Sequence, residues 1–585
     1  MNRTLSPPIN FIFLLTWIIF VAYSCQNPAP LPHPDQDNGG LSLPGGFGAL
    51  VVVDSIGKGR HLAVNENGDI YVKLRYAREV GSNVALRDTT GDGKADIISY
   101  FGEYEDEGSL ANGMRIHDGY LYYSAARVVY RNRLVPGQLI PDSPMEVVLT
   151  DDHEHGIHWH ITKPVSFDME GNMYVPFGSP SNACQDLVNK PGGIPGSEGL
   201  DPCPELIEHG GIWKFPKDKL GMTQKDGELY ATGIRSVVAM DFNQQDNHLY
   251  LVMHGRDNLH LLYPETFTPW ESAVLPSEEF IKVTQGADYG WPYCYYDQIQ
   301  RKKVLAPEYG GDGKIIGRCG DMDDPAMGFP GHWAPNDLLF YKGDQFPERY
   351  KGGAFVAFHG STNRAPYPQS GYFVAFVPFE NGQPTGDWEV FANGFAGTNP
   401  IVNVSDAEFR PMGLAEGPDG SLYISDSNKG RIWRVLFTGD KNSFGEESLA
   451  AMEAQKQLAN IRNPHPEQDN LYRGKQPQGN QVYTTYCAPC HQRDGKGAAG
   501  RIPGLHQTEW VSGDKERLIR IVLQGLDGEI EVNGERYDNV MPAHGFLDDQ
   551  QIASVLTYLR QNFENQASPV MPEEVASLRT NSQEQ

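Results

Sequence analysis

Residues 67–72 read Asn-Gly-Asp-Ile-Tyr-Val, a tight turn followed by a short alternating strand. Four similar segments follow, at 118–123, 170–175, 246–251 and 419–424. The first three copies are 51 and 52 residues apart, counted between their turn glycines at 68, 119 and 171. This spacing is typical of four-stranded propeller blades separated by insertions. We therefore predict a six-bladed all-β propeller over residues 46–437, with the strand-like runs 353–358 and 372–377 in one of its later blades.

The composition fits a folded protein of more than one domain. The chain has 585 residues, too many for one ordinary core. Hydrophobic residues make up 39% and aromatic residues 11%, while 64 glycines and 42 prolines favour turns over long helices. The net charge of −27 argues against nucleic acids and acidic membranes as partners, because both attract basic patches.

A different pattern begins near residue 480. Cys487-Ala488-Pro489-Cys490-His491 matches the attachment motif of c-type haem, in which two thiols bind the vinyl groups and the histidine lies under the iron. The alternative is a redox or zinc motif. Zinc requires a second pair of ligands, and no other cysteine lies within 160 residues.

The sixth iron ligand is expected from Asn539-Val540-Met541-Pro542-Ala543-His544, 50 residues beyond His491. Met541 is the first candidate, since a thioether ligand raises the reduction potential and favours electron transfer. His544 is the competitor, although such a histidine is more often simply exposed. Asp548 caps an amphipathic helix that runs to Phe563. The segment from Gln481 to about Phe563 resembles a class I cytochrome c.

The domain boundaries follow from these patterns. We expect a helix and polar linker over 438–480, a small all-α cytochrome c domain over 481–565 and a polar tail over 566–585. At the N-terminus, Arg3 and the apolar run 11–22 predict an export signal over 1–24, too short to span a bilayer. Its end resembles a lipoprotein signal with Cys25 as the lipidated residue, followed by a flexible tether over 25–45. Ordinary cleavage or a short membrane anchor are the alternatives.

Four cysteines remain once Cys25 and the haem pair are assigned, at positions 184, 203, 294 and 319. An oxidising compartment favours disulfides, most simply Cys184–Cys203 and Cys294–Cys319, each closing a local loop. The sequence alone allows three pairings.

The propeller half resembles the soluble glucose/sorbosone dehydrogenase family, more closely its sorbosone branch. Members of that family are six-bladed propellers that use pyrroloquinoline quinone (PQQ). The resemblance covers most of 46–437 and is carried by six motifs in order. These are His160 upstream of 167–171, Gly233-Ile234-Arg235, His254-Gly255-Arg256-Asp257, Tyr289-Gly290-Trp291-Pro292, His359-Gly360-Ser361-Thr362-Asn363-Arg364, and Arg410-Pro411-Met412-Gly413-Leu414 with the turn that follows it.

The resemblance implies roles for several of these residues. His160 would be the base that takes the hydroxyl proton of the substrate. Arg235 would stabilise the negative charge that develops on the quinone. The carboxylates of PQQ would be held by Arg410 and Arg364 with Asn363, because guanidinium forks fit carboxylates. Main-chain carbonyls near Gly255 and Arg256 would hold a calcium ion.

One departure from the family affects the base. An aspartate orients the histidine in the family, and the matching position here is Ser179. A serine can accept a hydrogen bond but carries no charge to stabilise an imidazolium. His153, His155 and His158 compete with His160 for the same role, and a surface metal site is the structural alternative for this cluster.

A second candidate calcium site is the loop Asp88-Thr89-Thr90-Gly91-Asp92-Gly93-Lys94-Ala95-Asp96. Aspartates at this spacing around glycines resemble a calcium loop. A hairpin turn without metal explains the same residues equally well.

Together these patterns predict an exported quinohaemoprotein of a bacterium, periplasmic or lipid-anchored. A sugar, alcohol or aldehyde would lose two electrons at PQQ, and haem c would pass them singly to a periplasmic acceptor. One alternative is a calcium-dependent lactonase on the same fold, which would need a carboxylate-rich metal site. The other is a propeller without catalysis that serves as a docking module for the cytochrome.

Overall fold

The computed structural model describes residues 1, 31–78, 81–104, 112–153, 160–185, 192–365, 367–466 and 479–581. The candidate lipid site Cys25 and, beyond Met1, the expected export signal lie outside these ranges. Within them, no helix combines the length and the apolar character needed to cross a membrane.

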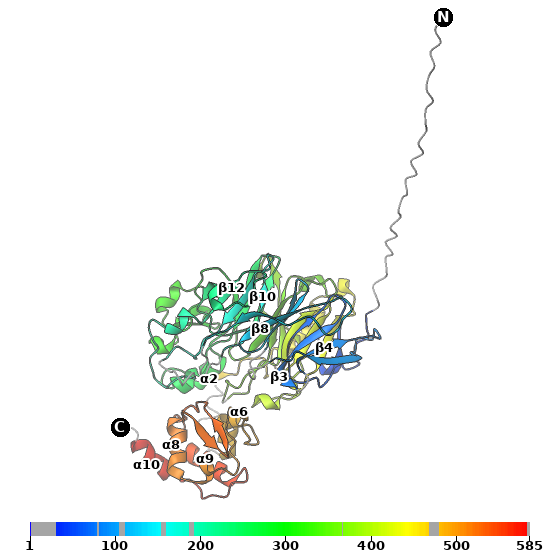
Figure 1. Ribbon diagram of the computed structural model, residues 1–585. Coiled ribbons are helices and arrows are strands. Elements are labelled where there is room, and N and C mark those ends of the chain that lie inside the picture. The colour runs from blue at the N-terminus through cyan, green and yellow to red at the C-terminus, as the bar shows by residue number, and fades with distance from the viewer. Residues whose placement is uncertain are drawn as a thin grey trace. The chain divides into compact units, whose positions relative to one another are not determined.

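Six four-stranded antiparallel sheets are present in the described residues and confirm the predicted propeller (Figure 1). The first three are β2–β5 (Gly59–Val64, Ile70–Arg78, Gly81–Arg87, Ile97–Phe101), β6–β9 (Met114–His117, Tyr120–Ser124, Val128–Arg133, Glu146–Thr150) and β10–β13 (Ser166–Phe167, Met173–Phe177, Gly211–Phe215, Glu228–Thr232). The next two are β14, β15, β16 and β19 (Val237–Asn243, His248–Met253, Glu278–Val283, Met327–Phe329) and β20, β21, β22 and β25 (Pro335–Phe340, Ala354–Phe358, Phe373–Val377, Glu389–Ala392).

The sixth sheet closes the ring by joining the two ends of the propeller sequence. Its strands are β26 (Pro411–Glu416), β27 (Leu422–Asp426), β28 (Ile432–Phe437) and, at the outer edge, β1 (Phe47–Val53). In β1, Phe47 pairs with Phe437 of β28. The Phe47 ring also packs edge-on against Phe346 and Phe391, with centroids 4.8 and 5.1 Å away.

The repeated turn-and-strand segment has the same place in each sheet where it occurs. Its strand is β3, β7, β11, β15 or β27, the second strand of the sheet. The turn glycines adopt left-handed backbone conformations, for example a φ of +89° at Gly68. The tyrosine that follows is buried in all five copies, at positions 71, 122, 174, 250 and 423. Each copy therefore supplies a tight turn and a core residue to its blade.

Antiparallel order brings the sequence motifs to one end of the propeller. Arg235 precedes β14 and Arg410 precedes β26, so both lie at the start of a first strand. His254 follows β15 and His359 follows β21, so both lie at the end of a second strand. Because first and second strands run in opposite directions, these two kinds of position face the same end.

The C-terminal residues form a helical domain, orange to red in Figure 1. It contains α5 (Gly479–Val482), a π-helical turn (Tyr483–Cys487), α6 (Ala488–His491), α7 (Glu509–Ser512), α8 (Lys515–Gln524), the hairpin β29–β30 (Ile530–Val532, Glu535–Tyr537), α9 (Asp549–Gln561) and α10 (Pro572–Asn581). As the sequence predicts, Asp548 caps α9, its side chain accepting a 2.7 Å hydrogen bond from the Gln551 amide. The expected polar tail instead includes α10, because Val575 and Leu578 pack into the core of this domain.

The remaining short elements connect or decorate the blades. They are α1 (Leu259–Leu262), α2 (Pro269–Val274), the hairpins β17–β18 (Cys294–Asp297, Lys302–Leu305) and β23–β24 (Phe379–Glu380, Gln383–Pro384), and α3 (Glu446–Gln455). Helix α3 lies within the helix and linker segment expected over 438–480 and ends at Gln455, with Lys456 as its C-cap.

Replacement of Phe47 by alanine should destabilise the propeller by about 3–5 kcal/mol, because it removes a buried ring from the closing strand. Intrinsic tryptophan fluorescence during urea unfolding measures the effect. Ile97→Ala, at an exposed position of β5, is the control and should cost less than about 0.5 kcal/mol. Equal losses in the two variants would contradict a role for Phe47 in ring closure.

Candidate cofactor sites

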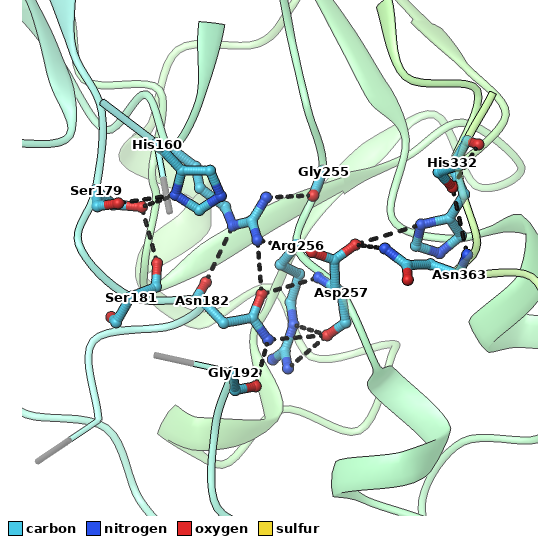
Figure 2. A network of polar contacts seen from close by, with 12 residues as sticks. His160, Ser179, Ser181, Asn182, Gly192, Gly255, Arg256, Asp257, His332 and Asn363 are labelled. Carbon is cyan, nitrogen blue, oxygen red and sulfur yellow. Dashed lines mark hydrogen bonds and ion pairs between the residues drawn. The ribbon is translucent and has the colours of Figure 1, made fainter. Parts of the chain in front are cut away.

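His160 lies at the end of the propeller that carries the motifs, and its ring is held by the neighbouring chain segment. Nδ1 lies 2.7 Å from the main-chain oxygen of Ser179 and 3.1 Å from its Oγ (Figure 2). Gly178 permits this approach, since a Cβ there would lie 2.3 Å from the His160 carbonyl oxygen. A hydrogen on Nδ1 that donates to the Ser179 carbonyl leaves Nε2 as the basic nitrogen.

Ser179 stands where the related family has an aspartate, but it orients His160 mainly through its main chain. Its main-chain oxygen makes the shorter contact with the imidazole, so orientation does not depend on the serine side chain. Ser179 Oγ donates to Ser181 O at 2.8 Å. The carboxylate of Glu205 accepts from Ser181 Oγ at 2.6 Å. The imidazole is therefore oriented directly by a main-chain carbonyl, and the serine beside it is linked through Ser181 to the carboxylate of Glu205.

Of the competing histidines, only His153 is described. Its Nδ1 lies 2.7 Å from Asp151 Oδ1 and its Nε2 lies 3.5 Å from a Glu208 oxygen. The same Asp151 forms a buried ion pair with Lys163 at 2.8 Å. His153 is therefore engaged by carboxylates in a separate cluster. His155 and His158 lie outside the described residues.

Arg235 is buried and its guanidinium is almost fully used by protein acceptors. Nη2 donates to Asp257 Oδ2 at 2.9 Å and to Asn182 Oδ1 at 3.0 Å. Nη1 donates to the Gly255 carbonyl at 2.8 Å. Burial lowers the pKa of Arg235, and the charge of Asp257 opposes that effect. Arg235 is therefore fixed in position as a charged group.

Asp257 joins residues from neighbouring blades (Figure 2). Its carboxylate accepts from Arg235 and from the side-chain amide of Asn363, and His332 Nδ1 lies 3.7 Å away. The main-chain amide of Asp257 donates a hydrogen bond to Asn182 Oδ1 at 2.9 Å. Burial acts to raise the pKa of Asp257, but Arg235 and the other partners together lower it. Asn363, expected to hold a cofactor, is thus positioned by Asp257.

At the expected main-chain calcium site, Gly255 and Arg256 already have protein partners. The Gly255 carbonyl already accepts a hydrogen bond from Arg235, and the side chain of Arg256 is paired with Glu308 in a buried contact. Among the described residues, no three His, Cys, Asp or Glu side chains are grouped to hold a metal ion. Calcium binding through Gly255 and Arg256 stays a prediction.

A group of cationic residues lies beside this network. Arg410 Nη2 lies 2.7 Å from His359 Nδ1 and donates to Gly360 O at 2.6 Å. Burial lowers the pKa of His359 well below its usual value, with Arg410 and Arg60 adding to the effect. Burial also lowers the pKa of Arg60 to about 9, reinforced by Arg75 and Arg410. His359 is therefore neutral, and three guanidinium groups repel one another.

Arg364 carries a buried charge with incomplete hydrogen bonding. Its side chain is 1% exposed, and Nε and Nη1 have no hydrogen-bond partner among the residues that the structure describes. Burial lowers the pKa of Arg364 to about 9. The Nε atoms of Arg60 and Arg75 are likewise buried without a partner. Such groups cost free energy unless an anion binds them. The donors thus fit a compact ligand with several carboxylates.

Two disulfides, Cys184–Cys203 and Cys294–Cys319, fix loops next to this end, in the pairing that the sequence suggests. They pack together with Trp291, whose indole nitrogen donates to the Asn182 carbonyl at 3.0 Å. The loops are thereby linked to the segment that holds Arg235.

The candidate calcium loop at Asp88 is closed by its own hydrogen bonds. The amides of Gly91 and Gly93 each lie 2.7 Å from carboxylate oxygens of Asp88.

The haem motif borders an apolar cavity in the helical domain. Cys487 and Cys490 are unpaired thiols, and His491 Nδ1 lies 3.0 Å from the Pro503 carbonyl oxygen. That contact orients the ring with Nε2 as the ligating nitrogen. Cys487, His491 and Met541 all line the cavity, so the attachment and ligand residues of a haem are gathered around one apolar space. The residues present therefore fit a covalent haem.

Met541 is held by the main chain at the cavity wall. Its amide and carbonyl exchange hydrogen bonds of 2.8 and 2.9 Å with Leu526. Gly525 permits this pairing, since a Cβ there would lie 2.6 Å from the Met541 carbonyl oxygen. His544, three residues later, also lines the cavity and is buried rather than exposed. Burial is the main cause that lowers the pKa of His544 to about 4.

Sequence reasoning missed Arg60, Arg75 and Asp257 as site residues. Asp257 was part of a quoted motif but received no role. Arg60 lies at the start of β2, so it corresponds by blade position to Arg235 and Arg410. A comparison of first strands between blades would have found Arg60. Arg75, in the second strand β3, follows no such rule.

The fold and these two sites define a propeller oxidoreductase fused to a cytochrome c domain. The chain belongs to the TrAA12-like family, whose model matches residues 41–437. The cytochrome c family model matches residues 477–563, which implies covalent haem c. The match to the TrAA12-like family does not single out the sorbosone branch, and that finer assignment stays a prediction.

Three relatives of known sequence match parts of the chain. Cytochrome c-552 of Thermus thermophilus is 37% identical over 113 residues, which cover 18% of this chain and 86% of that protein. The fructose dehydrogenase cytochrome subunit of Gluconobacter japonicus is 24% identical over 334 residues, covering 54% of this chain and 60% of that one. An uncharacterised protein of Borreliella burgdorferi is 25% identical over 221 residues, covering 37% of this chain and only 51% of its own length.

Two solved structures share the propeller fold. The PQQ domain of pyranose dehydrogenase from Coprinopsis cinerea has a TM-score of 0.52 at 16% identity, covering 70% of this chain and 99% of that domain. A Trichoderma reesei enzyme of carbohydrate-active family AA12, solved with calcium, has a TM-score of 0.53 at 19% identity, covering 70% and 99%. At these identities the likeness establishes the fold alone.

Asp257→Ala should destabilise the propeller by about 3–5 kcal/mol, because it leaves Arg235 buried without its carboxylate. Urea unfolding followed by fluorescence measures the loss. Asp201→Ala is the matched control, since Asp201 and Arg318 form an exposed pair and the change should cost less than about 1 kcal/mol. Equal stability of Asp257→Ala and wild type would contradict the central place of this ion pair.

Proposed function

We propose that this protein is an exported PQQ-dependent dehydrogenase that oxidises a sugar, alcohol or aldehyde and passes the electrons to its own haem c. PQQ, when bound, would supply the two-electron acceptor, whereas haem takes one electron at a time. A downstream periplasmic carrier would receive the electrons. The N-terminal sequence supports export, with Cys25 as a proposed lipid anchor.

The observation that carries the proposal is the buried, uncompensated positive charge at one end of the propeller. Arg364 has two nitrogen atoms without partners, and Arg60 and Arg75 have one each. The side chain of Arg410 hydrogen-bonds to neutral acceptors of His359 and Gly360. Carboxylates of a planar cofactor would satisfy these donors and offset the repulsion among Arg60, Arg75 and Arg410. Asn363, placed by Asp257, would add a neutral donor or acceptor.

The reacting proton would be taken by His160. The hydrogen bond from Nδ1 to the Ser179 carbonyl holds the ring and leaves Nε2 basic. Arg235 would stabilise negative charge on the cofactor, as the related family implies, while Asp257 keeps its guanidinium in place. Without a carboxylate at position 179, the imidazolium formed by proton uptake gains less stabilisation than an aspartate would give.

The two alternative functions, a calcium-dependent hydrolase and a docking module without catalysis, would require other residues at this site. A calcium-dependent hydrolase needs several carboxylates around a metal, whereas the site is dominated by arginines. A docking module needs no buried unpaired guanidinium groups, and such groups are costly to keep. The arginine cluster therefore favours a cofactor site over both alternatives. A calcium ion beside the cofactor remains part of the proposal, because a structure of the Trichoderma reesei AA12 enzyme contains calcium.

The experiment follows haem reduction in the full-length protein matured with haem c. PQQ and calcium are added, then a panel of aldoses, ketoses, alcohols and aldehydes, and the haem absorption spectrum is recorded. We expect reduction only when PQQ and a substrate are both present. The variant His160→Asn should bind PQQ but reduce the haem at least about a hundred-fold more slowly. No reduction with any substrate would refute the dehydrogenase.

Arg364→Ala should weaken PQQ binding about ten- to a hundred-fold, as expected for loss of charged hydrogen bonds. Equilibrium titration by calorimetry measures the affinity. Without PQQ the same variant should be as stable as wild type or more stable, because a buried unpaired charge is removed. Arg349→Ala, at a partly exposed ion pair with Glu389, should leave the affinity unchanged. Lower stability of Arg364→Ala together with unchanged affinity would mean that the arginine is only structural.

A further inference from the structure

The distal part of the haem cavity contains two groups that can bind iron. Met541 supplies a thioether and His544 supplies an imidazole, and both line the cavity together with His491. The other lining residues, such as Val522, Leu556 and Leu559, are mostly aliphatic. A histidine in apolar surroundings needs a polar partner. In His544, the ring nitrogen Nδ1 has such a partner in the carbonyl oxygen of Pro542.

His544 is prepared in the same way as the proximal histidine. His491 Nδ1 lies 3.0 Å from the Pro503 carbonyl oxygen, and His544 Nδ1 lies 2.9 Å from the Pro542 carbonyl oxygen. Each contact places the hydrogen on Nδ1 and the lone pair on Nε2, the tautomer that ligates a metal. The two side chains are nearly equally buried, at 8% and 9% exposure.

The main chain holds His544 firmly at the cavity. Its amide donates to the Val522 carbonyl in α8 at 2.7 Å, and its carbonyl accepts from Leu547 at 3.0 Å. His544 is thus fixed at the cavity wall, independently of the side chain of Met541.

We propose that His544 is a second distal ligand, which occupies the sixth position of the haem iron when Met541 leaves it. His544 Nε2 would then supply the lone pair that Met541 Sδ supplies otherwise, and the exchange would transfer neither an electron nor a proton. Replacement of thioether by imidazole lowers the reduction potential of the haem. The cytochrome domain would then exist in a high-potential and a low-potential form. This inference concerns the haem domain alone and holds whether or not the propeller uses PQQ.

The test replaces Met541 by leucine, which preserves apolar volume, in the full-length protein with haem attached. Electron paramagnetic resonance and absorption spectra of the ferric protein should indicate a low-spin, six-coordinate haem with two nitrogen ligands. Its reduction potential should lie below that of wild type. The double variant Met541→Leu/His544→Ala should become high-spin and five-coordinate. It should also bind cyanide at least about ten-fold more tightly than Met541→Leu, because no internal ligand competes.

The matched control is Met541→Leu/His506→Ala. His506 belongs to the same domain but does not line the cavity, and its Nε2 contacts the Asp494 carbonyl at 2.7 Å. This variant should keep the low-spin spectrum. Met541→Ala provides a second background if leucine prevents haem attachment. A high-spin haem in both Met541→Leu and Met541→Ala would overturn the proposal. His544 would then have another partner, such as a haem propionate.

Discussion

Closure of the propeller ring is the constraint on which the candidate site depends. Strand β1 completes the sheet of β26–β28, so the start and the end of the propeller sequence share one blade. The site takes His160 from the entry to one blade, Asp257 from the next and Arg410 from the blade that β1 completes. These residues are far apart in sequence and meet only because the ring is closed. Loss of the closing strand would therefore separate the chemical groups as well as the blades.

The site contains buried arginines of two kinds, one paired with a carboxylate and others with unpartnered nitrogen atoms. Arg235 is compensated by Asp257 and carries a fixed charge, whereas Arg364, Arg60 and Arg75 retain buried nitrogen atoms without partners. The first arrangement is stable on its own. The second becomes favourable when an anion binds, because desolvation has already been incurred and the donors are oriented. The contrast explains how one end of the propeller can position residues and still bind a charged cofactor.

Much of the fold was predictable because its signals are local. The five turn-and-strand repeats and the strand-like runs 353–358 and 372–377 indicate the six blades. Cys487, Cys490 and His491 identify the haem domain without any tertiary information. The tail could not be recognised as α10, since Val575 and Leu578 gain their meaning only from the core that they contact. Within the site, Arg235 and Arg410 followed from motifs. The role of Asp257 did not, because it arises from contacts with Asn182 and Asn363 across the ring.

We propose that the arginine-rich end of the propeller receives PQQ through the carboxylates of the cofactor. A crystal structure of the haem-loaded protein with PQQ tests this most directly. We expect the cofactor carboxylates within hydrogen-bond distance of Arg364 and Arg410, with His160 Nε2 facing the remaining space for substrate. PQQ bound elsewhere, or arginines that contact only protein groups in the complex, would contradict the claim.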